Sequence, residues 1–255
     1  MSIDPSDLRS PSQQIAAGIR KEIREGRLAP GSQIPSEREL VDRYGVAPQT
    51  ARQAVALLKT EGLVIGRTGR GVFVREQPLL IRVGSDRYAR WRRDMGKAPF
   101  QAEIEAMGLT PKQDILELGE VPAPRWVADW FTIEPETPVF VRRRKTWVED
   151  TPTQIADSYY QLDTVQGTRI QEVDTGPGGG YARLEEKGYR LTHFREEIRI
   201  RMPTPEEAGA IRLAPGVPVA HLHRIAFTAD GPIEVFEAIL AGDKHTFAYD
   251  FPAPD

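Results

Sequence analysis

Apolar residues near the start of the chain recur at helical spacing. Ile15, Ile19 and Ile23 lie four residues apart, which places them on one face of a helix. The pattern predicts an amphipathic helix over residues 12–25. Gly26 follows directly and is expected to end it, because glycine is favoured just beyond a helix C-terminus.

Two shorter helices are predicted close behind the first. Ser36 and Glu39 have the spacing of a capping box, so a second helix is expected to start there. Gly45 is able to adopt the positive φ that ends it. A third helix is expected from Ala47 or Pro48. Two short helices joined by a tight turn are a device that places one helix end in a DNA groove.

Alternation replaces helical spacing after the third helix. Residues 62–75 alternate around a glycine-rich centre, which predicts a β-hairpin with its tip at residues 68–71. A glycine-rich loop is also able to cradle a nucleotide phosphate, but the Walker lysine and the helix that follows it are missing. A hairpin wing that carries Arg67 and Arg70 beside the third helix fits better.

Alternating segments dominate the second half of the chain. Strands are predicted over residues 115–121, 139–148, 153–160, 194–201, 217–228 and 233–240. Turn sequences at residues 149–152 and 229–232 join two pairs of these strands. Short helices are predicted over residues 124–130, 180–187 and 204–211. The fold class is therefore α+β, with an antiparallel sheet and a few short helices in the second half.

Length and charge favour two domains. The chain has 255 residues, of which 40% are hydrophobic, and we expect domains at residues 1–76 and 98–255. Residues 1–76 hold 12 Lys and Arg against 9 Asp and Glu, so they carry +3 and the remainder carries −6 of the net −3. The basic half is the one expected to meet phosphates.

Residues 77–97 are expected to form a linker between the two domains. They are rich in arginine and include Tyr88 and Trp91. Two interpretations stay open: a solvated linker, or a segment that docks through its aromatic residues and contacts phosphate or clamps the domains.

Several function classes are excluded by composition. The chain has no cysteine, which excludes disulfides, thiolate metal sites and cysteine nucleophiles. No run of about 18 apolar residues is present, so no membrane span is expected. The polar N-terminus lacks a signal-peptide apolar region, and a cytoplasmic location follows. No cofactor is expected.

The N-terminal motifs occur in a characteristic order. They comprise a Pro-Gly pair at residues 30–31, then residues 35–40, 44–46, 61–63 and 69–74. With these motifs, residues 12–75 resemble the winged helix-turn-helix of the GntR family of bacterial transcription regulators. The resemblance implies that Arg38, Thr50 and Arg52 contact DNA, and that Gly69 enters the minor groove.

The start of the third helix departs from that family. Ala47 and Pro48 stand where the family usually has Ser-Arg, so Gln49 is expected to take over part of the base contacts. The operator sequence is therefore expected to differ. The predicted DNA-binding residues are Ser36, Arg38, Ala47, Pro48, Gln49, Thr50, Arg52, Arg67, Thr68, Gly69 and Arg70.

The C-terminal segments also match a known domain. The features that carry the match are residues 138–144, 150–152, 157–160, 196–199, 218–219, 224 and 230–235. With them, residues 98–255 resemble the UTRA effector-binding domain of the HutC subfamily of GntR regulators. The resemblance implies a chorismate-lyase-like fold that binds a small effector and forms homodimers.

Arg142 and Arg144 indicate where an effector would bind. Alternation places both on one strand face. Two arginines on a core face need a counter-charge: either an anionic ligand, or Glu197 and Glu237 from neighbouring strands. The predicted effector-binding residues are Arg142, Arg144, Ser158, Tyr160, Arg199, Glu234 and Tyr249. The loop at residues 174–181 is either a lid over this site or a long connection.

Three histidines are candidate metal ligands. His221 and His223 share one strand face, and His245 is a candidate third ligand. Because the sequence shows no acidic partner at ligand spacing, ordinary strand histidines are expected and no metal is predicted.

The sequence therefore predicts an effector-responsive transcription regulator. A homodimer is expected to bind a palindromic double-stranded operator as a repressor, and a small anionic or sugar-like metabolite is expected to release it. It is not expected to be an enzyme, because no nucleophile–base pair or carboxylate dyad stands out. The alternatives are a chorismate-lyase-like enzyme and a ligand-independent DNA-binding protein.

Overall fold

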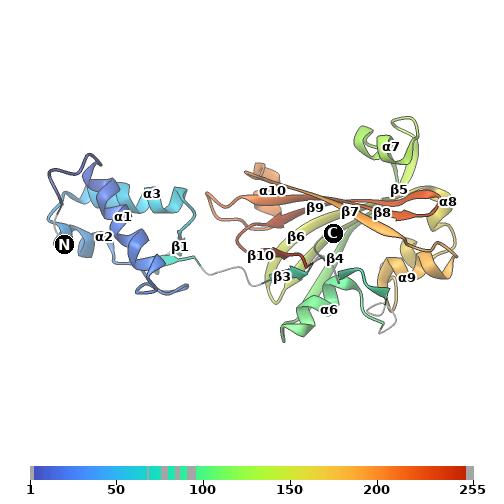
Figure 1. Cartoon of the computed structure of the whole chain (residues 1–255), viewed down its shortest axis with the longest axis horizontal. Coiled ribbons are helices and arrows are strands. Elements are labelled where there is room, and N and C mark those ends of the chain that lie inside the picture. The colour runs from blue at the N-terminus through green and yellow to red at the C-terminus, as the bar shows by residue number, and fades with distance from the viewer. Residues whose placement is uncertain (1–2, 68, 76–79, 84–86, 91–95, 251–255) are drawn as a thin grey trace, which may run out of the picture. The chain divides into compact units, whose positions relative to one another are not determined.

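The chain folds into two compact units. The computed structural model describes residues 3–67, 69–75, 80–83, 87–90 and 96–250. The first unit comprises Met1–Gln77 with Leu213–Val217, and the second comprises Pro78–Arg212 with Pro218–Asp255. Helices dominate the first unit and a broad sheet dominates the second (Figure 1).

The first unit is a three-helix winged helix-turn-helix, as the sequence predicts. Its elements are α1 (Pro11–Arg24), α2 (Glu37–Tyr44), α3 (Pro48–Thr60), β1 (Val64–Arg67) and β2 (Gly71–Val74). The fully buried Ile15, Ile19 and Leu40 form its core. Helix α1 begins one residue earlier than expected, because Ser10 forms a capping box with Gln13.

The second unit is built on an antiparallel sheet. Its strands are β4 (Pro111–Pro122), β5 (Pro138–Val148), β6 (Thr151–Tyr160), β7 (His193–Arg201), β8 (Val219–Thr228) and β9 (Gly231–Ala241). They lie in the order β4-β5-β6-β9-β8-β7. All six strands were predicted, and the two hairpin turns join β5 to β6 and β8 to β9.

Helices cover both faces of this sheet (Figure 1). Helix α7 (Arg125–Phe131) packs on the face that carries Val141, Tyr159 and Val235. Helix α9 (Gly179–Glu186) packs on the other face, which carries Phe140 and Tyr160. Because side chains alternate along each strand, odd and even residues of β5 and β6 serve different faces.

The described part of residues 77–97 belongs to the second unit. Strand β3 (Leu80–Val83) pairs in parallel with β10 (His245–Ala248), and Arg87 and Tyr88 are buried. This favours docking over a solvated linker at these residues. The remaining elements are α6 (Pro99–Ala106), α8 (Leu162–Val165), η1 (Arg169–Gln171) and α10 (Pro205–Ala210).

Candidate functional site

The start of α2 presents an arginine to solvent. The Oγ of Ser36 accepts the backbone N–H of Glu39 at 3.3 Å, and Glu39 Oε2 accepts the backbone N–H of Ser36 at 2.7 Å. The hydrogen bonds from Ser36 lower the pKa of Glu39. Arg38 is exposed and has no hydrogen bond or ion pair with any residue the structure describes. It is therefore available to a phosphate.

The first turns of α3 carry exposed polar side chains. Pro48 is the first helical residue, and Ala47 provides no side-chain cap. Gln49 and Arg52 are exposed, and Thr50 is half-buried. Arg52 contacts Gln49 at 3.5 Å and Glu37 at 3.4 Å. Long contacts between exposed groups contribute little free energy, so Arg52 is able to exchange them for a base edge.

The hairpin between β1 and β2 forms the wing. The backbone N–H of Arg70 donates to the Arg67 carbonyl at 2.9 Å and closes its turn. Gly69 has a φ of +69°, which glycine adopts without strain. The guanidinium of Arg67 lies 4.7 Å from the centre of the Phe73 ring. Thr68 lies outside the described residues.

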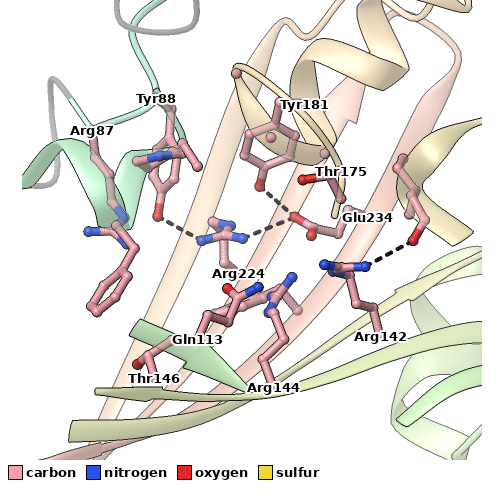
Figure 2. Close-up of a pocket in the computed structure, with 18 of the residues that line it drawn as sticks. Arg87, Tyr88, Gln113, Arg142, Arg144, Thr146, Thr175, Tyr181, Arg224 and Glu234 are labelled. Atoms are coloured by element: carbon pink, nitrogen blue, oxygen red, sulfur yellow. Dashed lines mark hydrogen bonds and ion pairs between the residues drawn. The ribbon is translucent and has the colours of Figure 1, made fainter. Parts of the chain in front are cut away.

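The second unit contains a cavity of about 150 Å³ on the sheet face under α9. In another protein, an engineered cavity of about the same volume binds one benzene molecule, so this volume accommodates one six-membered ring. Residues that line it include Arg87, Tyr88, Gln113, Arg142, Arg144, Thr146, Gln154, Tyr160, Tyr181, Arg224, Glu234 and Phe236 (Figure 2). Part of the predicted loop, Thr175 and residues 178–180, also borders it.

Arg142 and Arg144 bring positive charge to this cavity. Arg142 donates to three backbone carbonyls, those of Ile170 at 3.2 Å, Glu172 at 2.5 Å and Val173 at 2.7 Å. Burial, and then the neighbouring charge of Arg144, lower the pKa of Arg142 to about 10. Carbonyl oxygens satisfy its N–H groups without neutralising its charge.

Arg144 has one hydrogen-bond partner among the described residues. Its Nη2 donates to Ser158 Oγ at 2.7 Å, and its guanidinium lies 5.7 Å from the Phe236 ring centre. Among the residues that the structure describes, neither Arg144 nor Arg142 forms an ion pair. The predicted pairing with Glu197 or Glu237 is wrong, because the register places both glutamates on the opposite sheet face.

A buried ion pair forms the opposite wall of the cavity. Arg224 Nη2 lies 3.0 Å from Glu234 Oε2, with side chains 7% and 4% exposed. Glu234 also accepts a hydrogen bond from Tyr181 at 2.5 Å, and Arg224 Nη1 donates to Tyr88 at 2.8 Å (Figure 2). Tyr160 donates to Glu234 at 2.8 Å. Burial raises the pKa of Glu234, but these partners outweigh it and lower the value.

The cavity therefore carries an unbalanced positive charge. Its lining includes four arginines and one carboxylate. Glu234 neutralises Arg224, and Arg87 pairs with Glu103 just outside the lining. Two arginines remain, so the cavity is suited to an anion that accepts charge-assisted hydrogen bonds.

Two family models match the chain in the same order as the two units. Residues 11–74 match the model of bacterial regulatory proteins of the gntR family, and residues 106–246 match the UTRA domain. The chain belongs to the GntR family. It is a transcription regulator with a DNA-binding domain and a UTRA effector domain, and this confirms the resemblance predicted from the sequence.

Similar proteins support this assignment over the full length. An HTH-type transcriptional regulator of Streptomyces coelicolor is 36% identical over 95% of this chain and 93% of its own length. The repressor NagR of Bacillus subtilis is 22% identical over 92% of both. The crystal structure of PhnF from Mycobacterium smegmatis shares the fold, with a TM-score of 0.58 at 21% identity over 94% of this chain and 100% of that chain.

The regulator's described helices include none that is both long and apolar enough to cross a membrane.

The structure brings together part of the predicted effector set. Arg142, Arg144, Tyr160 and Glu234 line the cavity, and Ser158 is fully buried behind Arg144.

Arg199 and Tyr249 are not among the lining residues. Arg199 pairs in register with His221, which places it on the opposite face. Tyr249 is 47% exposed and donates to Glu196 at 3.1 Å.

Other residues that line the cavity were absent from the predicted effector-binding set. Arg224 stands alone between Leu222 and Ala226 at core-facing positions of β8, and a single arginine in such a stripe is a detectable signal of a buried charge. Tyr88 comes from the segment whose docking through aromatic residues was one of two open interpretations, and Tyr181 lies where the predicted loop and the predicted helix overlap. Neither residue was predicted to line an effector site.

The histidines of β8 have an acidic partner that the sequence did not reveal. Glu237 on β9 contacts both His221 and His223. Burial raises the pKa of Glu237, but hydrogen bonds from both histidines outweigh burial and bring it to about 2. His245 lies apart from them, with its Nδ1 2.9 Å from the Ala241 carbonyl oxygen.

Proposed function

We propose that this regulator is a homodimeric repressor whose operator affinity is controlled by a small anionic metabolite bound in the arginine cavity. The observation that carries the proposal is Arg144, a cavity-lining guanidinium that forms no ion pair with any residue the structure describes. A palindromic operator would match the two-fold symmetry of such a dimer. Because its proposed target is DNA, the regulator would act in the cytoplasm.

The lining supports an effector that combines negative charge with neutral polar groups. Arg142 and Arg144 would bind a phosphate or carboxylate, and Thr146 and Gln154 offer uncharged polar groups beside them. The cavity volume suits one sugar-sized ring.

Repression is supported by two relatives. NagR is named a transcriptional repressor, and MngR of Escherichia coli, 24% identical over 88% of both proteins, is named the repressor of a mannosyl-D-glycerate transport and metabolism system. In our proposal, the bound effector shifts the population of dimer geometries and thereby lowers operator affinity.

Replacing Arg144 with glutamine tests the anion site. Calorimetry against phosphorylated and carboxylated sugars first identifies the anions that bind the wild-type protein. We expect Arg144→Gln to bind these anions at least about tenfold more weakly, because a charged hydrogen bond contributes about 1.5–3 kcal/mol. Lys145→Gln is the matched control, since it removes the same charge from the opposite face of the same strand. Equal affinity for wild type and Arg144→Gln would refute the assignment.

A further inference from the structure

Three potential metal ligands converge on the sheet face opposite the arginine cavity. His221 and His223 lie on β8, and Glu237 lies directly across from His223 on β9. The Nε2 atoms of the two histidines are 3.0 Å apart. Glu237 Oε1 is 2.5 Å from Nε2 of His221 and 3.5 Å from Nε2 of His223. One potential ligand atom of each side chain thus lies within 3.5 Å of the other two.

The geometry is close to that of a tetrahedral metal site. Zinc–nitrogen and zinc–oxygen bonds of about 2.0–2.2 Å at tetrahedral angles separate neighbouring ligand atoms by about 3.3–3.5 Å. The 3.5 Å between Glu237 Oε1 and His223 Nε2 matches that value. The 3.0 Å between the two histidine nitrogens and the 2.5 Å between Glu237 and His221 are shorter, so these side chains would have to rotate apart to admit an ion.

The cluster is both supported and accessible. The indole of Trp126 on α7 stacks on the His223 ring, with ring centres 4.5 Å apart and an interplanar angle of 8°. The side chains of His221, His223 and Glu237 are 18%, 25% and 28% exposed. Solvent therefore reaches them, and water is able to fill a fourth ligand position.

We propose that His221, His223 and Glu237 form a binding site for a divalent transition metal ion of the zinc class. Two neutral imidazoles and one carboxylate are a donor set that suits zinc and excludes calcium and magnesium, which take oxygen ligands. The site is separate from the effector cavity, and the proposal does not depend on the proposed function.

Metal binding changes the hydrogen bonds of His221. Its Nε2 would coordinate the ion, so in the neutral ring the proton would move to Nδ1. Arg201 Nε lies 3.5 Å from that nitrogen, at the limit of a hydrogen bond, and would lose the contact. Glu207 pairs with the Arg201 guanidinium through both oxygens, at 2.7 Å each, so Arg201 stays satisfied.

The bound ion would also cross-link two strands of the effector domain. His223 and Glu237 belong to β8 and β9, the strands whose other face carries Arg224 and Glu234. A ligand that binds only the folded state stabilises it, so the ion is expected to raise the melting temperature of this domain.

Calorimetry on the full chain tests the site. After dialysis against a chelator, we expect wild type to bind one Zn²⁺ per chain and to gain visible d–d absorption with Co²⁺. Replacing a residue that hydrogen-bonds a metal ligand costs about 10- to 100-fold in metal affinity. His223→Gln and Glu237→Gln remove proposed ligands themselves, so we expect each to lose at least about tenfold. His193→Gln is the control, because His193 also stacks on an aromatic ring, that of Phe227, but lies outside the cluster.

Two results would overturn the proposal. One is a wild-type protein that binds neither ion. The other is stoichiometric Zn²⁺ binding that His223→Gln and Glu237→Gln both retain at wild-type affinity. Glu237→Gln keeps the size and hydrogen-bonding ability of the side chain, so it separates a lost ligand from a lost fold. Circular dichroism of each variant verifies this.

Discussion

The Arg224→Met variant is expected to lose about 3–5 kcal/mol of unfolding free energy in the effector domain, because removal of one partner of a buried ion pair leaves the other charge uncompensated. Glu234 is 3% exposed, and among the described residues the hydroxyls of Tyr160 and Tyr181 would remain as its hydrogen-bond partners. Urea unfolding followed by tryptophan fluorescence measures the loss. All four tryptophans lie in the second unit, so the signal reports that unit alone.

The paired variant supplies the control. Arg224→Met combined with Glu234→Gln removes both charges and keeps an acceptor for the tyrosine hydroxyls, so we expect it to be more stable than Arg224→Met alone. An unchanged urea midpoint in Arg224→Met would show that the pair does not hold this wall of the cavity together.

Arg52→Ala is expected to abolish specific operator binding. A good bidentate arginine–base contact contributes about 1–3 kcal/mol, or about 5- to 150-fold in affinity for each recognition helix. Arg52 is exposed on the first turns of α3, and its contacts with Glu37 at 3.4 Å and Gln49 at 3.5 Å are long. The measurement is fluorescence anisotropy with duplex DNA that wild type has selected from a random pool.

Lys59→Ala is the matched variant for this experiment. It removes one positive charge from the last turn of the same helix. We expect Lys59→Ala to keep its preference for the selected DNA over random DNA, whereas Arg52→Ala loses that preference. If Arg52→Ala bound the selected DNA as tightly as wild type, the assignment of Arg52 would be wrong.

Elements with local signals could be predicted from the sequence. The capping box of Ser36 and Glu39 and the positive φ of Gly45 both occur where expected. Strand β3 could not be predicted, because its four residues pair with β10 more than 150 residues away. No pattern within so short a segment indicates such a partner.

The cluster of His221, His223 and Glu237 was harder to predict, because its members meet only in the observed pairing register of β8 and β9. The pairing of β8 with β9 shifts by one residue between Ala226 and Phe227. Without that bulge, Phe236 would lie opposite His223 and Glu237 would face away from the histidines.

The surroundings of Arg142 in the arginine cavity were also hard to predict. Its carbonyl partners come from a segment about 30 residues away that has no strand or long helix.

In our proposal, an anion in the arginine cavity controls DNA binding. The test is a titration of the wild-type protein bound to its selected DNA, followed by anisotropy, with the phosphorylated and carboxylated sugars that calorimetry shows to bind. We predict that at least one releases the DNA, and that Arg144→Gln binds the DNA normally but needs at least about ten times more of that compound. Release at the same concentration in both proteins, or no release by any bound anion, would refute the proposal.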